Sequence, residues 1–272
     1  MTIMMEAKEL KEQLNKENLM IIDVRTKYDA YDSGEAAYEA SHIPGAVFLD
    51  MKKDVTGEKQ FLPEPHRLAE KLGSLGVSEK DNIVLYDQGN NRASSKAWVA
   101  LHHLGHDRIF ILHGGYPAWE NEDYEQSTEL RVKESTTYQV NLRKSSVMTL
   151  TEVKQQLQEE ALTLIDSRSY ERYSGKVEPT YKKAGHIPGA VNYESKEIFD
   201  TQGNLKAEPA LQAHFQHIHQ DEKVVVSCGS GGSACMNIVA LVEAGYKDVA
   251  LFAGGFSEWI EDDSNDIATE DQ

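Results

Sequence analysis

The sequence has little cysteine, little positive charge and no long apolar run. Only two of its 272 residues are cysteines, Cys228 and Cys235. This number excludes a disulfide framework and predicts a reducing compartment, the cytoplasm. No apolar stretch reaches the roughly 20 residues that cross a bilayer, so we expect no membrane-spanning segment. The first residues, Met1–Leu14, mix acidic and lysine side chains without an apolar signal region and predict a short amphipathic helix.

Positive charge is scarce because 45 acidic residues oppose 28 basic ones, for a net charge of −17. A field of this sign repels polyphosphate, which argues against nucleic acid as a partner. A hydrophobic content of 40% and a charged content of 27% are typical of a soluble globular protein. The acidic end, Glu261–Gln272, predicts a frayed and solvated tail.

Four motifs occur twice, in the same order and at a nearly constant offset. The pairs are Ile21–Arg25 with Leu164–Arg168, His42–Val47 with His186–Val191, Asn82–Ser94 with Lys223–Cys235, and Ile109–Trp119 with Val249–Trp259. The offset is far longer than the period of a solenoid. The chain is therefore predicted to contain a duplicated domain.

Each copy alternates short β-branched runs with helical patterns. In the second copy the predicted strands are Leu162–Asp166, Ala190–Tyr193, Lys223–Ser227 and Val249–Phe252, and the predicted helix spans Ser233–Gly245. This alternation predicts an α/β protein of two tandem domains, each a mainly parallel sheet flanked by helices. The polar stretch around 121–145 predicts a linker, with domains at 1–125 and 146–272 and the linker at 126–145.

Residues that both copies share are expected to serve the architecture. We expect His42 and His186 to be turn and hydrogen-bonding residues, since the first also occurs in the copy without a cysteine. Two further sets recur. They are the Asp-x-Arg pairs, predicted to be internal ion pairs (Asp23 with Arg25, Asp166 with Arg168), and two tryptophans predicted to lie in the cores (Trp119, Trp259).

Residues that differ between the copies indicate where chemistry occurs. Asp87 aligns with Cys228, so only the second copy has a nucleophile, and Ala30 aligns with Arg172. Residues 25–40 hold two basic and four acidic side chains, whereas residues 168–183 hold five basic and two acidic ones. Because the positive segment accompanies the cysteine, we expect the substrate of the thiol to be an anion.

The loop after Cys228 has the composition of an anion-binding nest. Gly229, Gly231 and Gly232 let the backbone curl so that successive amides and a helix N-terminus face a thiolate. Ser230 and Ser233 add hydroxyl donors, and Ser233 is predicted to cap the helix that follows. We expect Asp87 to bind the amides of its own loop, and Cys235 to be a packing residue.

These motifs resemble the tandem-domain sulfurtransferases of the rhodanese and 3-mercaptopyruvate sulfurtransferase family. The resemblance covers nearly the whole chain and implies that Cys228 carries a persulfide, that residues 229–233 cradle it, and that Arg172 binds an anionic donor. Mercaptopyruvate enzymes carry a glycine and a serine after the cysteine, as Gly229 and Ser230 do here, whereas thiosulfate enzymes carry an arginine and a lysine. The resemblance thus favours 3-mercaptopyruvate as donor, with thiosulfate as the alternative.

The chain departs from the family pattern at two places. Gly232 and Ser233 stand where a valine and a threonine are usual, and Thr180 stands where a second substrate arginine is expected. Lys182 and Lys183 lie close by and are predicted to help bind the donor. Ser230 is predicted to stabilise the enolate that departs. The implied acceptor is a thiol, a thioredoxin-like protein or cyanide, with no cofactor.

Other functions have weaker support in the sequence. A cysteine-dependent phosphatase needs an arginine near the end of its loop, but Ser233, Ala234 and Cys235 follow the glycines. A non-enzymatic sulfur-relay or binding module stays open, because fold does not fix function. The two cysteines form no C-x-x-C pair, and three histidines (His214, His217, His219) are expected on a solvated helix surface, so no metal site is predicted.

Overall fold

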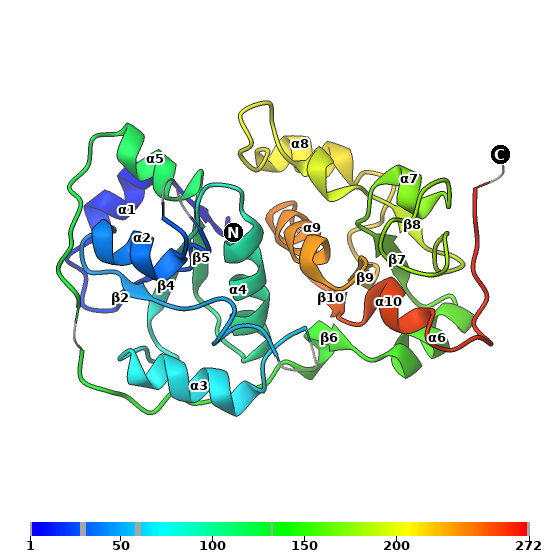
Figure 1. The fold of residues 1–272 in the computed structure, drawn as a ribbon, viewed down its shortest axis with the longest axis horizontal. Coiled ribbons are helices and arrows are strands. Elements are labelled where there is room, and N and C mark those ends of the chain that lie inside the picture. The colour runs from blue at the N-terminus through cyan, green and yellow to red at the C-terminus, as the bar shows by residue number, and fades with distance from the viewer. Residues whose placement is uncertain (1, 28–30, 58–60, 132, 271–272) are drawn as a thin grey trace. The chain divides into compact units, whose positions relative to one another are not determined.

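The computed structural model describes residues 2–27, 31–57, 61–131 and 133–270 (Figure 1). The chain divides into two compact units, Met1–Arg143 with Thr201–Leu205, and Lys144–Asp200 with Lys206–Gln272. Ala30, which aligns with Arg172, lies outside the described residues.

The first unit contains a parallel sheet in the order β1-β5-β4-β2-β3. Its strands are β1 (Met4–Met5), β2 (Leu19–Asp23), β3 (Val47–Phe48), β4 (Asn82–Tyr86) and β5 (Ile109–Leu112). Its helices are α1 (Ala7–Gln13), α2 (Gly34–Ala40), α3 (Pro65–Ser74), α4 (Arg92–His103) and α5 (Gly115–Asn121).

The second unit repeats this order as β6-β10-β9-β7-β8, again with parallel pairing. Its strands are β6 (Val147–Met148), β7 (Thr163–Asp166), β8 (Val191–Asn192), β9 (Val224–Ser227) and β10 (Val249–Phe252). Its helices are α6 (Leu150–Gln158), α7 (Tyr170–Tyr173), α8 (Glu208–His214), α9 (Gly232–Glu243) and α10 (Gly255–Trp259), with 3-10 turns η1 (Lys144–Ser146) and η2 (Ser195–Ile198).

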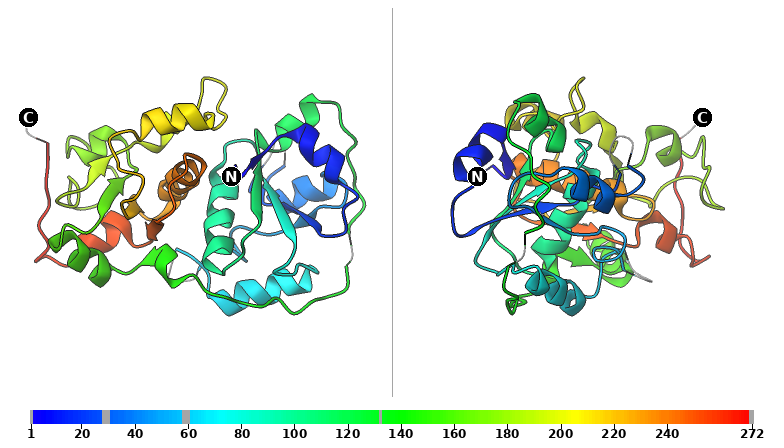
Figure 2. Two further views of the ribbon diagram at one scale, coloured as in Figure 1. Left: turned by 180° about the vertical axis from the view of Figure 1, so that it is seen from behind. Right: turned by 60° about the vertical axis from the view of Figure 1, so that its left-hand side comes forward.

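Each sheet is covered by helices on both faces (Figure 2). Helix α4 packs on β4 and β5, and α9 packs on β9 and β10. A strand buried on both faces is mainly apolar, which is why β2 and β9 begin with apolar runs in the sequence, Leu19–Ile22 and Val224–Val226. The predicted α/β duplication is confirmed.

The repeated histidines have structural roles in both units. The His186 ring stacks on Tyr173 with centroids 3.8 Å apart, and its Nδ1 lies 2.8 Å from the Tyr173 carbonyl oxygen. His42 repeats this arrangement on Tyr38, with centroids 4.1 Å apart. Both rings are buried. The structural interpretation of the repeated motif is confirmed.

The other shared residues are also buried where the duplication predicts them. Arg25 pairs with Asp23 at 2.6 Å, and Arg168 pairs with Asp166 at the same distance. The tryptophans of the repeated motif (Trp119, Trp259) lie in the two hydrophobic cores. These residues therefore stabilise the two units from inside.

The predicted frayed tail is wrong over residues 261–270. Ala268 exchanges two backbone hydrogen bonds with His186, at 2.8 and 2.9 Å, and the Asp266 carbonyl accepts from the indole N–H of Trp259. Ser127 makes the same bridge to His42 in the first unit. The tail is ordered because its backbone makes the same bridge to the histidine of the repeated motif as Ser127 makes in the first unit. Its acidic composition gives no sign of this bridge.

The stretch predicted as a linker packs along the first unit. The Thr136 N–H donates to the Gly73 carbonyl at 2.9 Å, and the Asn141 N–H donates to the Leu104 carbonyl at 3.0 Å. We propose that the domains divide near Lys144 rather than at residue 125, because the backbone up to Arg143 is bound to helices of the first unit.

Candidate active site

Cys228 follows the last residue of β9 and precedes the N-terminus of α9. Only 3% of the residue is exposed, and its Sγ accepts a hydrogen bond from the Gly231 N–H at 2.9 Å. Gly231 has a φ of +98°, which turns its amide toward the sulfur and which a side chain would strain. The loop thus curls over its own thiol.

The start of α10 holds this loop from outside. The Phe256 N–H donates to the Cys228 carbonyl at 2.8 Å, and the Ser257 N–H donates to the Gly229 carbonyl at 3.0 Å. A Cβ on Gly255 would lie 2.4 Å from the Cys228 carbonyl oxygen. The sequence interpretation missed Gly255, although the repeated Gly-Gly before each aromatic was a usable signal.

The loop in the first unit has the same form around a carboxylate. The Asp87 side chain accepts from the backbone N–H groups of four residues in the loop and the first turn of α4, at 2.8 to 3.3 Å, and from the Ser94 hydroxyl at 3.0 Å. The four donors are Gly89, Asn91, Ala93 and Ser94. The expected role of Asp87 is confirmed: this loop binds a carboxyl group of its own chain.

The serines and the second cysteine take different positions around the nest. Ser230 is exposed and Ser233 is half-buried. The predicted cap by Ser233 is wrong, because α9 begins one residue earlier, after Gly231 as N-cap, and has no side-chain cap. Cys235 is fully buried within α9, consistent with a packing residue.

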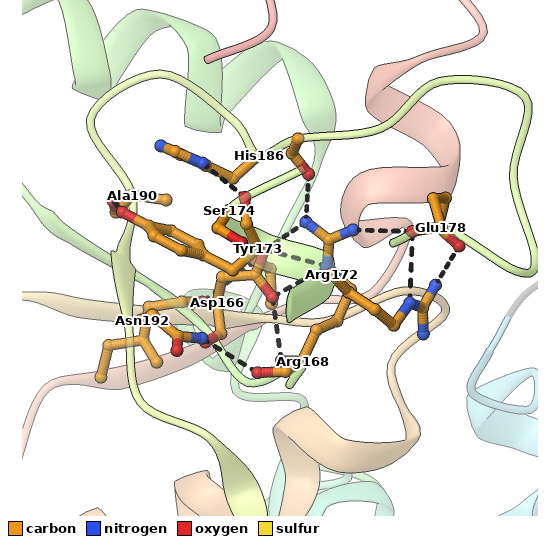
Figure 3. A network of polar contacts seen from close by, with 12 residues as sticks. Asp166, Arg168, Arg172, Tyr173, Ser174, Glu178, His186, Ala190 and Asn192 are labelled. Carbon is orange, nitrogen blue, oxygen red and sulfur yellow. Dashed lines mark hydrogen bonds and ion pairs between the residues drawn. The ribbon is translucent and has the colours of Figure 1, made fainter. Parts of the chain in front are cut away.

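Arg172 is held by a carboxylate that the sequence interpretation passed over. Glu178 accepts from Arg172 Nη2 at 2.8 Å and from Nε at 3.2 Å, and also from Arg168 Nη1 at 3.2 Å (Figure 3). Burial favours the neutral acid, but hydrogen bonds from Arg172 and the Thr180 amide outweigh it and lower the pKa of Glu178. Glu178 is thus an anion shared by two arginines.

Arg172 keeps donors beyond this pair. Its side chain is 24% exposed, and among the described residues neither N–H of Nη1 has a hydrogen-bond partner. Its Cζ lies 5.4 Å from the ring centroid of Tyr181, whose hydroxyl lies against Gly229. This contact links the guanidinium to the Cys228 loop, so Arg172 can bind an anion there.

The two predicted lysines differ in their surroundings. Lys183 pairs with Asp263 at 2.8 Å, which offsets its charge, whereas Lys182 is exposed. We therefore keep Arg172 as the first candidate for anion binding and the lysines as secondary ones.

The predicted helix surface of three histidines is wrong, because α8 ends at His214 and the other two histidines follow it in the chain. His217 and His219 are exposed, but the ring of His214 packs edge-on against Tyr193, with centroids 5.3 Å apart. Within the described ranges no group of three acidic, histidine or cysteine side chains could hold a metal ion. In the same part of the chain, no helix is both long and apolar enough to cross a bilayer.

Comparison with known proteins agrees with this geometry. The family model of the rhodanese-like domain matches residues 6–122 and 149–262. The chain belongs to the rhodanese-like domain family. Cys228 of this rhodanese-like chain lies in the second matched segment.

Relatives of the chain extend over both rhodanese-like domains. A Pseudomonas aeruginosa protein named "Probable 3-mercaptopyruvate sulfurtransferase" is 32% identical, over 98% of each chain. The thiosulfate sulfurtransferase of Cricetulus griseus is 31% identical over 82% of this chain and 78% of its own. The crystal structure of the 3-mercaptopyruvate sulfotransferase SseA from Escherichia coli superposes with a TM-score of 0.81 at 29% identity, over 94% of this chain and 99% of that one.

Proposed function

We propose that this chain is a sulfurtransferase that moves sulfane sulfur through a persulfide on Cys228. The donor is a small anion, with 3-mercaptopyruvate favoured and thiosulfate as the alternative. The acceptor is a thiol, a thioredoxin-like protein or cyanide, and the compartment is the reducing cytoplasm. Cys228 and Ser230 act on the reacting atoms, Arg172 binds the donor, and the residue 229–233 loop cradles the sulfur.

The observation that carries the proposal is the pair of matched loops. In the first unit the amides of Ala93 and Ser94 converge on one oxygen of Asp87, at 3.1 Å each. The corresponding residues after Cys228 are Ala234 and Cys235. The outer sulfur of a persulfide lies one bond beyond Sγ and carries a negative charge. It corresponds in position to a carboxylate oxygen of Asp87, which lies one bond beyond Cγ. The same nest therefore suits a persulfide anion.

The reaction that this loop supports has two displacements. The Cys228 thiolate attacks the sulfur of 3-mercaptopyruvate, an S–S bond forms, and the C–S bond breaks. Its electron pair leaves as pyruvate enolate, which takes up a proton to become pyruvate. The acceptor thiolate or cyanide then attacks the outer sulfur, and the electron pair of the S–S bond returns to Cys228 as thiolate.

The surroundings of the thiol favour 3-mercaptopyruvate over thiosulfate. Thiosulfate and its leaving sulfite are compact dianions that gain most from full cations beside the sulfur. Gly229 and Ser230 offer amide and hydroxyl dipoles there, whereas Arg172 offers its charge farther along the site. A carboxylate several atoms away from the reacting sulfur matches that arrangement. A phosphoryl group has no arginine in the loop to bind it.

The decisive experiment is intact-mass measurement after incubation with each donor. We expect the mass of one sulfur atom to be added, on the peptide that contains Cys228. Cys228→Ser should abolish the adduct and turnover, and the matched variant Cys235→Ser should keep both. Side-by-side kinetics with a common acceptor should give a higher kcat/KM for 3-mercaptopyruvate than for thiosulfate. An adduct on Cys235 would overturn the assignment of the nucleophile.

A further inference from the structure

Tyr181 is fixed by the same carboxylate that fixes Arg172. Glu178 Oε1 accepts from Arg172 Nη2 at 2.8 Å, from the Thr180 N–H at 2.9 Å and from the Tyr181 N–H at 3.2 Å. One buried oxygen thus joins the guanidinium to the turn that carries the tyrosine. The backbone of Tyr181 is therefore set relative to Arg172.

The ring of Tyr181 packs between Arg172 and the element that supports the cysteine loop. Its centroid lies 5.4 Å from Arg172 Cζ, within the range of a cation–π contact, and 6.2 Å from the centroid of Phe256, edge-on. Phe256 in turn donates its backbone N–H to the Cys228 carbonyl. These contacts hold the ring beside the candidate site.

The hydroxyl of Tyr181 lies against the residue that follows the nucleophile. A Cβ built on Gly229 would stand 2.7 Å from Tyr181 Oη and 3.3 Å from its Cε2. Gly229 does not have a positive φ, and the atoms nearest to an added Cβ all belong to the phenol ring of Tyr181. Among the described residues the hydroxyl has no hydrogen-bond partner of its own. A half-buried phenol next to a nucleophile thus has an unused donor.

We propose that Tyr181 contacts the donor: its hydroxyl donates a hydrogen bond to an oxygen of the anionic donor that Arg172 binds. The suitable class is a 2-oxo carboxylate that carries a thiol, because its oxygens extend from the reacting sulfur at Cys228 toward the guanidinium. This inference rests on the proposed function.

The test is Tyr181→Phe, which keeps the ring and its packing and removes only the hydroxyl. With 3-mercaptopyruvate we expect KM to rise by about tenfold or more, the effect of losing a hydrogen bond to a charged group, with little change in kcat. The rate at which cyanide discharges a preformed persulfide should not change, because the donor has already left. The melting temperature should also stay the same.

Tyr170→Phe is the matched control, since Tyr170 is an exposed tyrosine of the same unit and is expected to leave KM unchanged. A wild-type KM for Tyr181→Phe would overturn the inference while Cys228→Ser still abolished the persulfide. The inference would also be overturned if Tyr181→Phe slowed persulfide formation and discharge by cyanide equally. The hydroxyl would then affect the conformation of the Cys228 loop rather than contact the donor. If the wild-type protein forms no persulfide with any anionic donor, the proposed function fails, and this inference fails with it.

Discussion

Arg172 combines a fixed position with unused donors. Glu178 holds one edge of its guanidinium, and both N–H groups on Nη1 have no partner among the described residues. We therefore expect Arg172→Ala to raise KM for an anionic donor and to lower kcat/KM by about 1.5–3 kcal/mol, the value of a charge-assisted hydrogen bond. Steady-state kinetics with 3-mercaptopyruvate measures both.

Lys183→Ala is the matched charge removal. Because Lys183 already pairs with the exposed Asp263, its loss should change kcat/KM by less than about 1 kcal/mol. Equal losses for the two variants would mean that donor binding depends on net charge rather than on Arg172.

At this scale the sequence predicts residue types better than their pairings. Comparison of the two copies singled out Cys228 and Arg172, because each has an uncharged or differently charged counterpart. It did not single out Glu178, which is one of two acids in a basic segment. The Glu178 side chain turns inward to two arginines because of the path of the 174–190 loop. The sequence of this loop has no hydrophobic periodicity from which that path could be predicted.

Among the elements, α10 supports the nucleophile loop from behind, and the contact depends on a glycine. Gly255→Ala would bring a Cβ to 2.4 Å from the Cys228 carbonyl oxygen at a φ of +54°. We expect a loss of about 2–4 kcal/mol in the free energy of unfolding and a fall in kcat, because the loop must shift. Chemical denaturation and single-turnover persulfide formation measure the two effects.

Gly203→Ala separates backbone strain from the clash. Gly203 also has a positive φ, of +85°, but an added Cβ there would have no neighbour within 4 Å. It should lose only about 1 kcal/mol and keep wild-type persulfide formation. If Gly255→Ala behaved in the same way, α10 would not hold the loop.

Of the strands predicted in the second unit, β9 and β10 are largely buried, whereas β8 is a two-residue strand with an exposed Val191. The run that became β10 is apolar at all four residues, β9 has three consecutive valines, and α9 has an apolar pattern with a glycine stop. The two-residue strands β1 and β6 were missed, because so short a segment has no period. The ordered tail was missed for a different reason: its hydrogen bonds use backbone groups, which do not depend on acidic composition.

For the molecule as a whole, the duplication allows a reciprocal exchange between the two loops. Cys228→Asp should fold and stay inactive, because the equivalent loop accepts a carboxylate on four amides. Asp87→Cys should not create a second active site, because residues 25–40 carry a net negative charge where residues 168–183 are positive. Mass measurement and turnover of both variants test this, and a persulfide on residue 87 would contradict it.

The whole-molecule architecture was the most predictable level. Two copies of one motif order imply two units with one sheet order, and both sheets have it. The division that we propose near Lys144 was less predictable, since Thr136 and Arg143, in the polar stretch, bind helices of the first unit through backbone groups.

The backbone amides that donate to the Asp87 side chain also have a consequence for hydrogen–deuterium exchange. Amide protons bonded to a buried anion exchange slowly with deuterated water, so the loop after β4 should label late at all times. In the loop after Cys228 the Gly231 amide donates to the sulfur, and we expect this loop to label sooner than the Asp87 loop until an outer sulfur arrives. The Asp87 loop of the first unit therefore serves as an internal reference in the same exchange experiment. It gives the amide protection expected of the Cys228 loop once that loop holds a negatively charged outer sulfur.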